Sequence, residues 1–321
     1  MDVSRRNFLK YCGISATALG LSATDLLHLE EALANPSTPT VVWLQGSSCT
    51  GCTESFLNRI ATTAPVSAGD VLINSINLSY HPTLMATAGQ TAVNVAKAAY
   101  NRGGYVLVVE GGVPTAFGGA CCFAWTDNGV DVTFLDAVKT MASKAAKVVC
   151  VGTCASYGGV PAAGTNPAGI KGVKAAIGVN TINIAGCPPH PNWIVWGIVQ
   201  ILLGNAISLD SQGRPSALYN TTVHEHCLYN DEDKVSTFGQ SGCLRNLGCR
   251  GPQTYANCPQ QLWNNGVNWC IGAGAPCIGC TESTFPGANP FYAQTSGGNS
   301  GGSGGNSGGS GGNSDTHRRD D

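Results

Sequence analysis

The stretch "VVWLQGSSCTGCTESFLN", Val41 to Asn58, runs from a short apolar strand through a loop into a helix-like segment. In a nucleotide-binding protein with this order of elements, glycines in the loop would surround a phosphate. Here two cysteines, Cys49 and Cys52, stand in that place. The chain therefore puts two thiols at the carboxyl end of its first predicted strand.

Apolar runs of strand length alternate with Ala-rich helical stretches up to about residue 204. Strands that are apolar throughout and separated by helices indicate a parallel sheet covered on both faces. The predicted strands are Val41–Leu44, Val71–Leu78, Tyr105–Glu110, Lys147–Gly152 and Thr181–Ala185. The predicted helices include Met85–Tyr100, Phe134–Ala146 and Asn192–Leu203. The predicted fold class is therefore α/β, with a flavodoxin-like open parallel sheet domain over residues 35–209.

The chain changes character after about residue 209. Residues 210–294 are rich in Gly, Asn, Pro and Cys, show little periodicity, and carry seven of the fifteen cysteines. Burial of apolar side chains could hardly hold such a segment together, whereas metal ligation couples binding to folding. We therefore predict a second, loop-rich domain that folds around metal.

The two ends of the chain are not part of the predicted domains. Residues 1–34 combine "SRRNFLK" (Ser4 to Lys10) with an apolar run and the small residues "ALA" (Ala32 to Ala34), the pattern of a twin-arginine export signal. Since that route moves folded proteins, we expect assembly in a reducing cytosol and export to the periplasm. Residues 295–321 form a Gly/Ser/Asn-rich tail that should behave as flexible coil.

The overall charge limits the kind of partner. The formal net charge is −2, and 11 % of the residues are charged. This argues against nucleic acid, because phosphate binding needs a basic face. After the signal, no apolar run reaches the roughly 18 residues that a membrane-spanning helix needs. We expect a protein partner, and no membrane span in the mature chain.

The cysteines of the first domain fall where a parallel sheet binds its ligands, beyond the carboxyl ends of the strands. Cys49 and Cys52 follow the first predicted strand, Cys154 the fourth and Cys187 the fifth. Three loops that are far apart in the sequence could thus bring four thiolates to one point. Four thiolates suit zinc or an iron–sulfur cluster.

The second domain supplies two further groups of four ligand-type residues. The first group is His224, Cys227, Cys243 and Cys249, with His226 as the alternative histidine. The second group is Cys258, Cys270, Cys277 and Cys280. Cys12 lies in the export signal, and the cysteines outside the groups are Cys121, Cys122 and Cys150.

Two other interpretations compete for these cysteines. Fourteen cysteines in an exported chain could pair as disulfides, but twin-arginine export implies folding where thiols stay reduced. Structural zinc would explain each ligand set. It would not explain three sites distributed through one chain that also carries this export signal.

Taken in order, these motifs resemble the small subunit of nickel–iron hydrogenases. The blocks run from "WLQGSSCTGC" through "VEGGVPT", "VGTCASYGGVPAA", "GCPPHPNW" and "GCLRNLGCRGP" to "NCP", "NW" and "PCIGC". The resemblance implies a flavodoxin-like domain, a loop-rich iron–sulfur cluster domain and three clusters in a row. It assigns a proximal [4Fe-4S] cluster to Cys49, Cys52, Cys154 and Cys187, and a distal [4Fe-4S] cluster to His224, Cys227, Cys243 and Cys249. It assigns the medial cluster to Cys258, Cys277 and Cys280.

The medial motif departs from the commonest family pattern. Most members have a proline after "NW" and a [3Fe-4S] medial cluster on three cysteines, whereas this chain has Cys270 there. The departure is similar to the nickel–iron–selenium branch, so we predict a medial [4Fe-4S] cluster with Cys270 as the fourth ligand. Oxygen-tolerant members carry two further cysteines near the proximal cluster, at the positions of Gly51 and Gly159. We therefore predict an ordinary proximal cubane.

The resemblance also implies the activity. A large partner subunit would hold the Ni–Fe or Ni–Fe–Se centre that splits hydrogen, and this chain, without catalytic residues of its own, would relay the electrons. An exported enzyme without an anchor makes a multihaem c-type cytochrome the expected acceptor. Two alternatives are the cluster-bearing subunit of a quinone oxidoreductase, which lacks the second domain, and a stand-alone polyferredoxin.

Four further polar residues lie close to the predicted ligand loops. Glu54 and Glu110 lie at the sheet edge that should face the large subunit, where they could assist proton movement or docking. A helix N-terminal Glu and a capped strand end are the simpler interpretations, and we favour them. His81 and His190, each before a proline, are likewise interpreted as structural.

Overall fold

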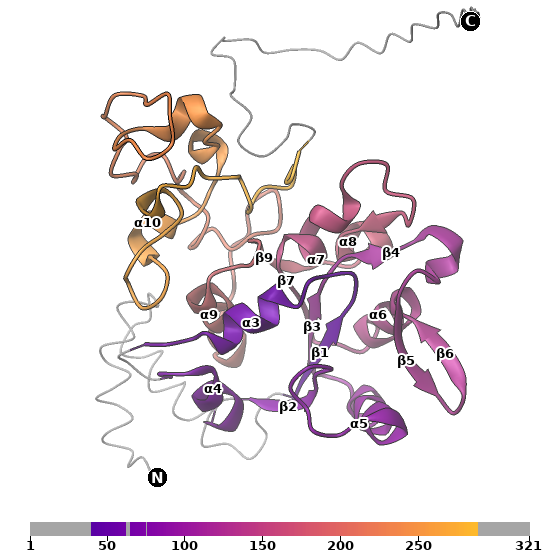
Figure 1. Ribbon diagram of the computed structural model, residues 1–321. Helices are drawn as coiled ribbons and strands as arrows, with labels where there is room; N and C mark the ends of the chain where they lie inside the picture. Colours follow the sequence, from indigo (N-terminus) through magenta and orange to yellow (C-terminus); the bar gives the residue numbers. More distant parts are fainter. Residues whose placement is uncertain (1–39, 62–64, 75, 288–321) are drawn as a thin grey trace, which may run out of the picture.

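The computed structural model describes residues 40–61, 65–74 and 76–287 (Figure 1). The predicted export signal, residues 1–34, and the predicted tail, residues 295–321, lie outside the described residues. Within the described part of the chain, no helix has the length and apolar character that a membrane crossing requires.

A five-stranded sheet forms the centre of the first domain, and every neighbouring pair in it is parallel. Its order is β2-β1-β3-β7-β9. The strands are β1 (Thr40–Gln45), β2 (Asn77–Tyr80), β3 (Val106–Glu110), β7 (Lys147–Val151) and β9 (Ile182–Ile184). Renumbered within the sheet this is 2-1-3-4-5, the flavodoxin-like order. The predicted fold class is confirmed.

Helices cover both faces of the sheet (Figure 1). One face packs against α3 (Gly51–Leu57), α4 (Ala68–Asn74) and α9 (Pro191–Leu202). The other packs against α5 (Gly89–Arg102) and α6 (Phe134–Ala142). Alternate strand residues point to opposite faces, so that Val41 and Trp43 belong to the first core and Val42 and Leu44 to the second.

One predicted strand was wrong in part. The stretch Val71–Leu78 was expected to form a single strand, but its first half ends helix α4 and only its second half enters β2. A short apolar run fits a buried helix as well as a strand, and period alone does not separate them. Val71 is buried in the core, as either element would require.

A hairpin that we did not predict lies between the third strand and α6. It consists of β5 (Phe123–Asp127) and β6 (Val130–Thr133), which pair antiparallel. Asn128 and Gly129 both have positive φ, 49° and 85°, at the two turn positions. An Asn-Gly pair is the usual sequence for this turn.

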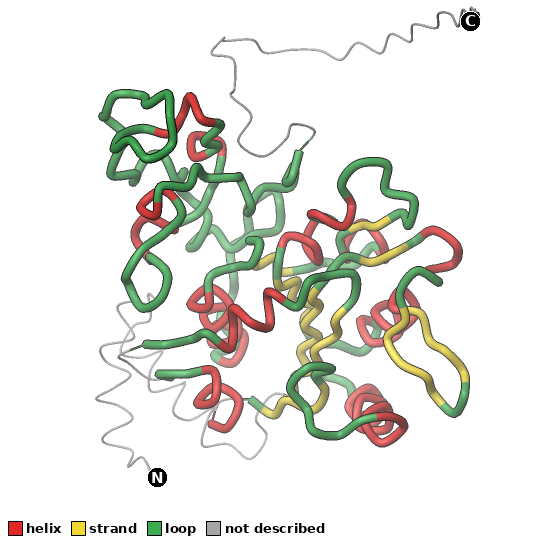
Figure 2. The backbone as a smooth tube through the Cα atoms, viewed as in Figure 1, coloured by secondary structure: helices red, strands yellow, loops and turns green. Residues whose placement is uncertain are grey.

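The second domain has few regular elements, and loops dominate it in Figure 2. Its elements are η3 (Leu244–Leu247), η4 (Gly251–Gln253), α10 (Cys258–Gln261) and η5 (Ile271–Ala273). The remaining short elements of the first domain are β4 (Val113–Pro114), η1 (Ala116–Gly119), α7 (Thr153–Tyr157), η2 (Val160–Ala162), β8 (Ile170–Lys171) and α8 (Val173–Ile177). The core beneath α9 continues into the second domain, where it includes Leu244, Trp269 and Ile271.

A buried arginine connects the start of the second domain to its end. Arg214 is 3 % exposed, and its guanidinium donates to Asp210 and Glu282, each at 2.8 Å. It also donates to the Thr281 carbonyl at 3.1 Å. Both carboxylates compensate the buried charge of Arg214. The two ion pairs therefore fix the segment that follows Cys280, which contains Glu282.

Candidate functional site

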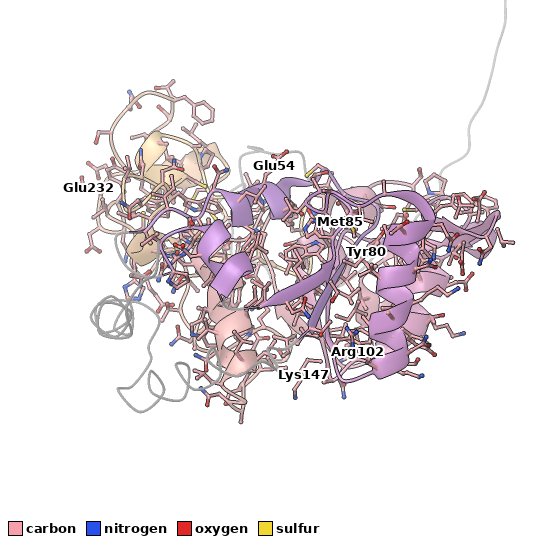
Figure 3. All side chains as sticks on the ribbon, turned by 90° about the horizontal axis from the view of Figure 1, so that it is seen from below. Glu54, Tyr80, Met85, Arg102, Lys147 and Glu232 are labelled. Atoms are coloured by element: carbon pink, nitrogen blue, oxygen red, sulfur yellow. The ribbon has the colours of Figure 1, made fainter. Side chains whose placement is uncertain are left out.

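The four cysteines of the first domain lie at one edge of the sheet. Cys49 and Cys52 follow β1, Cys154 lies in α7 directly after β7, and Cys187 follows β9. In Figure 3, Glu54, two residues after Cys52, lies at the top, and Lys147, which begins β7, lies at the bottom. The cysteines thus share the carboxyl edge that the sheet topology predicted.

The thiols of these four residues are close enough to influence one another. Burial raises the pKa of Cys52 well above its usual value, and the charges of Glu110, Cys154, Cys187 and Cys49 raise it further. Four thiolates this close together, with Cys52 buried among them, need positive charge to balance them. Iron in a cluster would supply that charge, so the donor set fits the expected group.

Three glycines allow the loops to approach these thiols. A Cβ built on Gly152, whose φ is +93°, would lie 2.4 Å from the Cys52 sulfur. A Cβ on Gly159 would lie 3.0 Å from the Cys154 sulfur, and one on Gly51 would lie 3.1 Å from the Cys49 sulfur. The two positions where oxygen-tolerant members carry cysteines therefore contact the cysteines of this group directly.

Glu110 ends β3 beneath this group and is fully buried. Its Oε1 accepts the backbone N–H groups of Cys52 at 3.1 Å and Thr53 at 3.2 Å. Its Oε2 accepts the Trp43 indole N–H at 3.0 Å and the Thr53 hydroxyl. The carboxylate therefore fixes the first turn of α3, which carries Cys52, and the interpretation of Glu110 as a structural strand end is supported.

The same network continues to His81, which is 1 % exposed. Its Nδ1 accepts the N–H groups of Thr83 at 3.1 Å and Leu84 at 3.3 Å. The ring proton is therefore assigned to Nε2, which lies 3.4 Å from the Thr53 hydroxyl oxygen. Burial lowers the pKa of His81 to about 4, so the ring is neutral at pH 7. His81 is a structural histidine, as expected.

His190 is the second buried histidine near the ligand loops. Its Nδ1 accepts the Asn192 N–H at 3.0 Å and caps α9, while its Nε2 lies 2.6 Å from the Leu262 carbonyl oxygen. Burial lowers its pKa to about 4. His190 therefore connects the Cys187 loop to the second domain, in agreement with a structural role.

The group with one histidine lies in the second domain around η3. Cys243 precedes η3, Cys249 follows it, and the N–H of Cys227 donates to the His224 carbonyl at 3.1 Å. Burial raises the pKa of Cys227, and the charges of Cys249 and Cys243 raise it further. The three thiols are thus neighbours. His224 is half-buried, whereas His226 is exposed.

The other group of the second domain consists of four cysteines, Cys258, Cys270, Cys277 and Cys280. Cys258 begins α10, Cys270 precedes η5, and Cys277 and Cys280 follow in a loop. Burial raises the pKa of Cys258 well above its usual value, and the charges of Cys280, Cys277 and Cys270 raise it further. The four cysteines that the spacing grouped are therefore close in space.

Hydrogen bonds connect the group that contains Cys280 to each of the other two groups. The Thr153 hydroxyl, next to Cys154, donates to the Cys280 carbonyl. The Arg250 N–H, next to Cys249, donates to the Cys277 carbonyl at 2.7 Å. The group of the first domain is therefore connected to the group that contains Cys280. That group is in turn connected to the group that contains His224.

The three cysteines outside the groups have different positions. Cys150 is buried within β7, Cys121 is exposed and Cys122 is half-buried in the turn before β5. All cysteines in the described residues are free thiols. In the same part of the chain, no three His, Cys, Asp or Glu side chains are placed to hold one metal ion.

Comparison with known proteins decides the family. A family model that describes the C-terminal part of the NiFe/NiFeSe hydrogenase small subunit matches residues 219–292. The periplasmic [NiFe] hydrogenase small subunit of Solidesulfovibrio fructosivorans is 40 % identical over 303 residues, which cover 91 % of this chain and 93 % of that one. This chain is a NiFe/NiFeSe hydrogenase small subunit.

Other comparisons agree with this family. The periplasmic [NiFeSe] hydrogenase small subunit of Desulfomicrobium baculatum is 37 % identical, and the match covers 91 % of this chain and 99 % of that one. A solved structure of the [NiFeSe] hydrogenase from the same organism superposes with a TM-score of 0.75 at 36 % identity, covering 81 % of this chain and all of that one. As a hydrogenase small subunit, the chain is part of a heterodimeric enzyme.

One match concerns the first domain alone. A model described as NADH ubiquinone oxidoreductase, 20 Kd subunit, matches residues 49–201. This similarity corresponds to the quinone oxidoreductase alternative. The matched region ends at residue 201, before the second domain begins. The separate match over residues 219–292 belongs to hydrogenases.

Proposed function

We propose that this small subunit relays electrons in a periplasmic hydrogenase through three [4Fe-4S] clusters. They would connect the Ni–Fe or Ni–Fe–Se centre of the large subunit with an external acceptor. The observation that carries the proposal is the connection of the three predicted ligand groups by the Thr153–Cys280 and Arg250–Cys277 hydrogen bonds. When bound, the clusters supply one-electron oxidation and reduction.

The proximal ligands in this proposal are Cys49, Cys52, Cys154 and Cys187. Support comes from their shared sheet edge and from the buried Glu110 that orients the amides of Cys52 and Thr53. Because positions 51 and 159 are glycines, neither of them supplies an additional thiol beside Cys49 or Cys154. We therefore infer an ordinary cubane, and two closely spaced proximal transitions in an oxidising titration would contradict it.

The medial ligands would be Cys258, Cys270, Cys277 and Cys280. The charge of Cys270 raises the pKa of Cys258, which supports its place in the group. A fourth thiolate can hold a fourth iron, so a [4Fe-4S] cluster is favoured over [3Fe-4S]. A strong three-iron EPR signal in the oxidised protein would contradict this assignment.

The distal ligands would be His224, Cys227, Cys243 and Cys249. A neutral imidazole in place of a thiolate leaves less negative charge on the iron and should raise the reduction potential. Electrons would then leave the protein from this end. The half-buried position of His224 beside Cys227 supports its choice over the exposed His226.

Three features support the remaining parts of the proposal. Relatives at 37–40 % identity are named periplasmic hydrogenase small subunits, in agreement with the twin-arginine pattern of residues 1–34. The large subunit would cover the edge at which Cys49 is exposed. A multihaem c-type cytochrome remains the proposed acceptor, because electrons that leave the enzyme in the periplasm need a carrier protein there.

Purification of the complex tests the function. We expect a larger nickel-containing subunit to co-purify, with iron sufficient for three four-iron clusters in this chain and hydrogen-dependent reduction of a c-type cytochrome. Metal analysis and EPR of the same sample identify the clusters. An active monomer without a nickel partner would instead support the polyferredoxin alternative.

A further inference from the structure

Thr153 contacts the backbone of two different ligand segments. It is the first residue of α7 and is 1 % exposed. Its N–H donates to the Gly186 carbonyl, and its hydroxyl oxygen accepts the Gly186 N–H, both at 2.9 Å. Thr153 precedes Cys154, and Gly186 precedes Cys187. These paired bonds therefore fix the two ligand loops relative to each other.

The same hydroxyl also reaches the second domain, where it donates to the Cys280 carbonyl. A threonine hydroxyl has one proton and two lone pairs. The Gly186 N–H occupies an acceptor position, so the proton is free to point at Cys280. The result is a continuous chain from the Gly186 N–H through the hydroxyl to the Cys280 carbonyl, in which each bond polarises the next.

The surroundings leave little freedom for another arrangement. Gly186 has φ +151°, and a Cβ at that position would lie 2.5 Å from the Pro189 Cα. On the other side, the Thr281 carbonyl accepts from buried Arg214, and the Thr281 hydroxyl donates to the Tyr255 carbonyl at 3.0 Å. Both segments that Thr153 joins are therefore held in place before the hydroxyl bridges them.

We propose that Thr153 is the positioning residue that sets the spacing and electronic contact between the proximal and medial groups. This inference rests on the proposed function, since it concerns those two groups. The hydroxyl acts through the backbones of Gly186 and Cys280. A second hydrogen bond joins the same two segments, because the Cys187 N–H donates to the Cys280 thiol. Removal of the hydroxyl bridge should therefore weaken their coupling without removing a ligand.

A purely structural threonine would behave differently. Loss of its hydroxyl would lower stability and leave the magnetic and electronic interaction between the groups unchanged. Thr281 provides the matched control, because it is also a fully buried threonine beside Cys280. Its hydroxyl bonds within the second domain, to Tyr255, and not to the Cys187 loop.

The test compares T153V, T153S and T281V in the intact heterodimer. EPR of the reduced protein measures the magnetic splitting between the proximal and medial clusters, and freeze-quench EPR measures the rate at which an electron equilibrates between them. Amide exchange measures the protection of residue 186. We expect T153V to show a smaller magnetic splitting, a slower electron equilibration and less amide protection at residue 186 than the parent. T153S, which keeps a hydroxyl, and T281V should both match the parent in these three measurements.

The outcomes separate this inference from the function on which it depends. Wild-type protein without iron in these two groups would overturn the proposed function. Wild-type protein with both clusters, combined with unchanged splitting and rate in T153V, would overturn only the role of Thr153. Loss of iron in T153V but not in T281V would support the positioning role, whereas equal loss in both variants would contradict it.

Discussion

Replacing Glu110 by glutamine tests how firmly the buried carboxylate holds the turn that carries Cys52. Glutamine has one acceptor oxygen where glutamate has two. If that oxygen keeps the bonds to the N–H groups of Cys52 and Thr53, the new NH2 faces the indole N–H of Trp43. Two donors then oppose each other in a fully buried place.

The magnitude follows from the lost bonds. An unpaired buried N–H of Trp43 costs about 1–3 kcal/mol. Replacing a charged acceptor by a neutral one costs about 1 kcal/mol more at the two backbone amides. The total of about 2–4 kcal/mol corresponds to amide exchange at Cys52 and Thr53 that is about 30-fold to 1000-fold faster.

Native-state hydrogen exchange of the complex, read by mass spectrometry over the peptide 50–57, is the assay. The control is E54Q, which makes the same chemical change at an exposed carboxylate in α3, within the measured peptide. We expect exchange in E54Q to match the parent. Exchange in E110Q within threefold of the parent would refute the view that this carboxylate stabilises the turn.

Three further predictions concern histidines and the fourth medial cysteine. Burial lowers the pKa of His81 to about 4 in the folded protein, whereas in the unfolded chain it is about 6.5. As the pH falls from 6.5 to 4, the unfolded chain binds a proton that the folded protein does not, so the free energy of unfolding should fall by about 3 kcal/mol. The urea midpoint measures this pH dependence, and H81N should flatten it. Replacing His224 by Cys should slow acceptor reduction while hydrogen–deuterium exchange at the nickel persists, and H226Q should change neither; an unaffected acceptor rate in H224C would exclude the exit role. Replacing Cys270 by Pro should produce a three-iron EPR signal, and the φ of −50° at this position is compatible with proline. An unchanged four-iron spectrum would show that Cys270 is not a ligand.

The sequence predicted the architecture well where its patterns were long. Alternating strands and helices indicated the sheet, and the position of each cysteine after a strand indicated the edge at which four thiols meet. The stretch around Val71 failed because so short a run fits two periods equally. The hairpin at Asn128 was missed although its Asn-Gly turn is a recognisable signal.

The residues behind the site were harder to predict. Thr53, Thr153 and Trp43 matter through hydrogen bonds to Glu110, Gly186 or Cys280, which are distant in the sequence. No local spacing encodes such pairs. The histidine choice illustrates the same limit, since the sequence offers only the spacing of His224 and His226 to Cys227, whereas the structure adds that His224 is half-buried and His226 exposed.

The apolar core beneath α9 has a consequence for protein engineering. It runs from Val41 in the first strand to Trp269 and Ile271 in the second domain without interruption. A cut near residue 209 would therefore divide this packed interior and expose part of it on each fragment. We expect that the second domain cannot be exchanged between related proteins as a cassette unless the facing side chains of α9 are transferred with it.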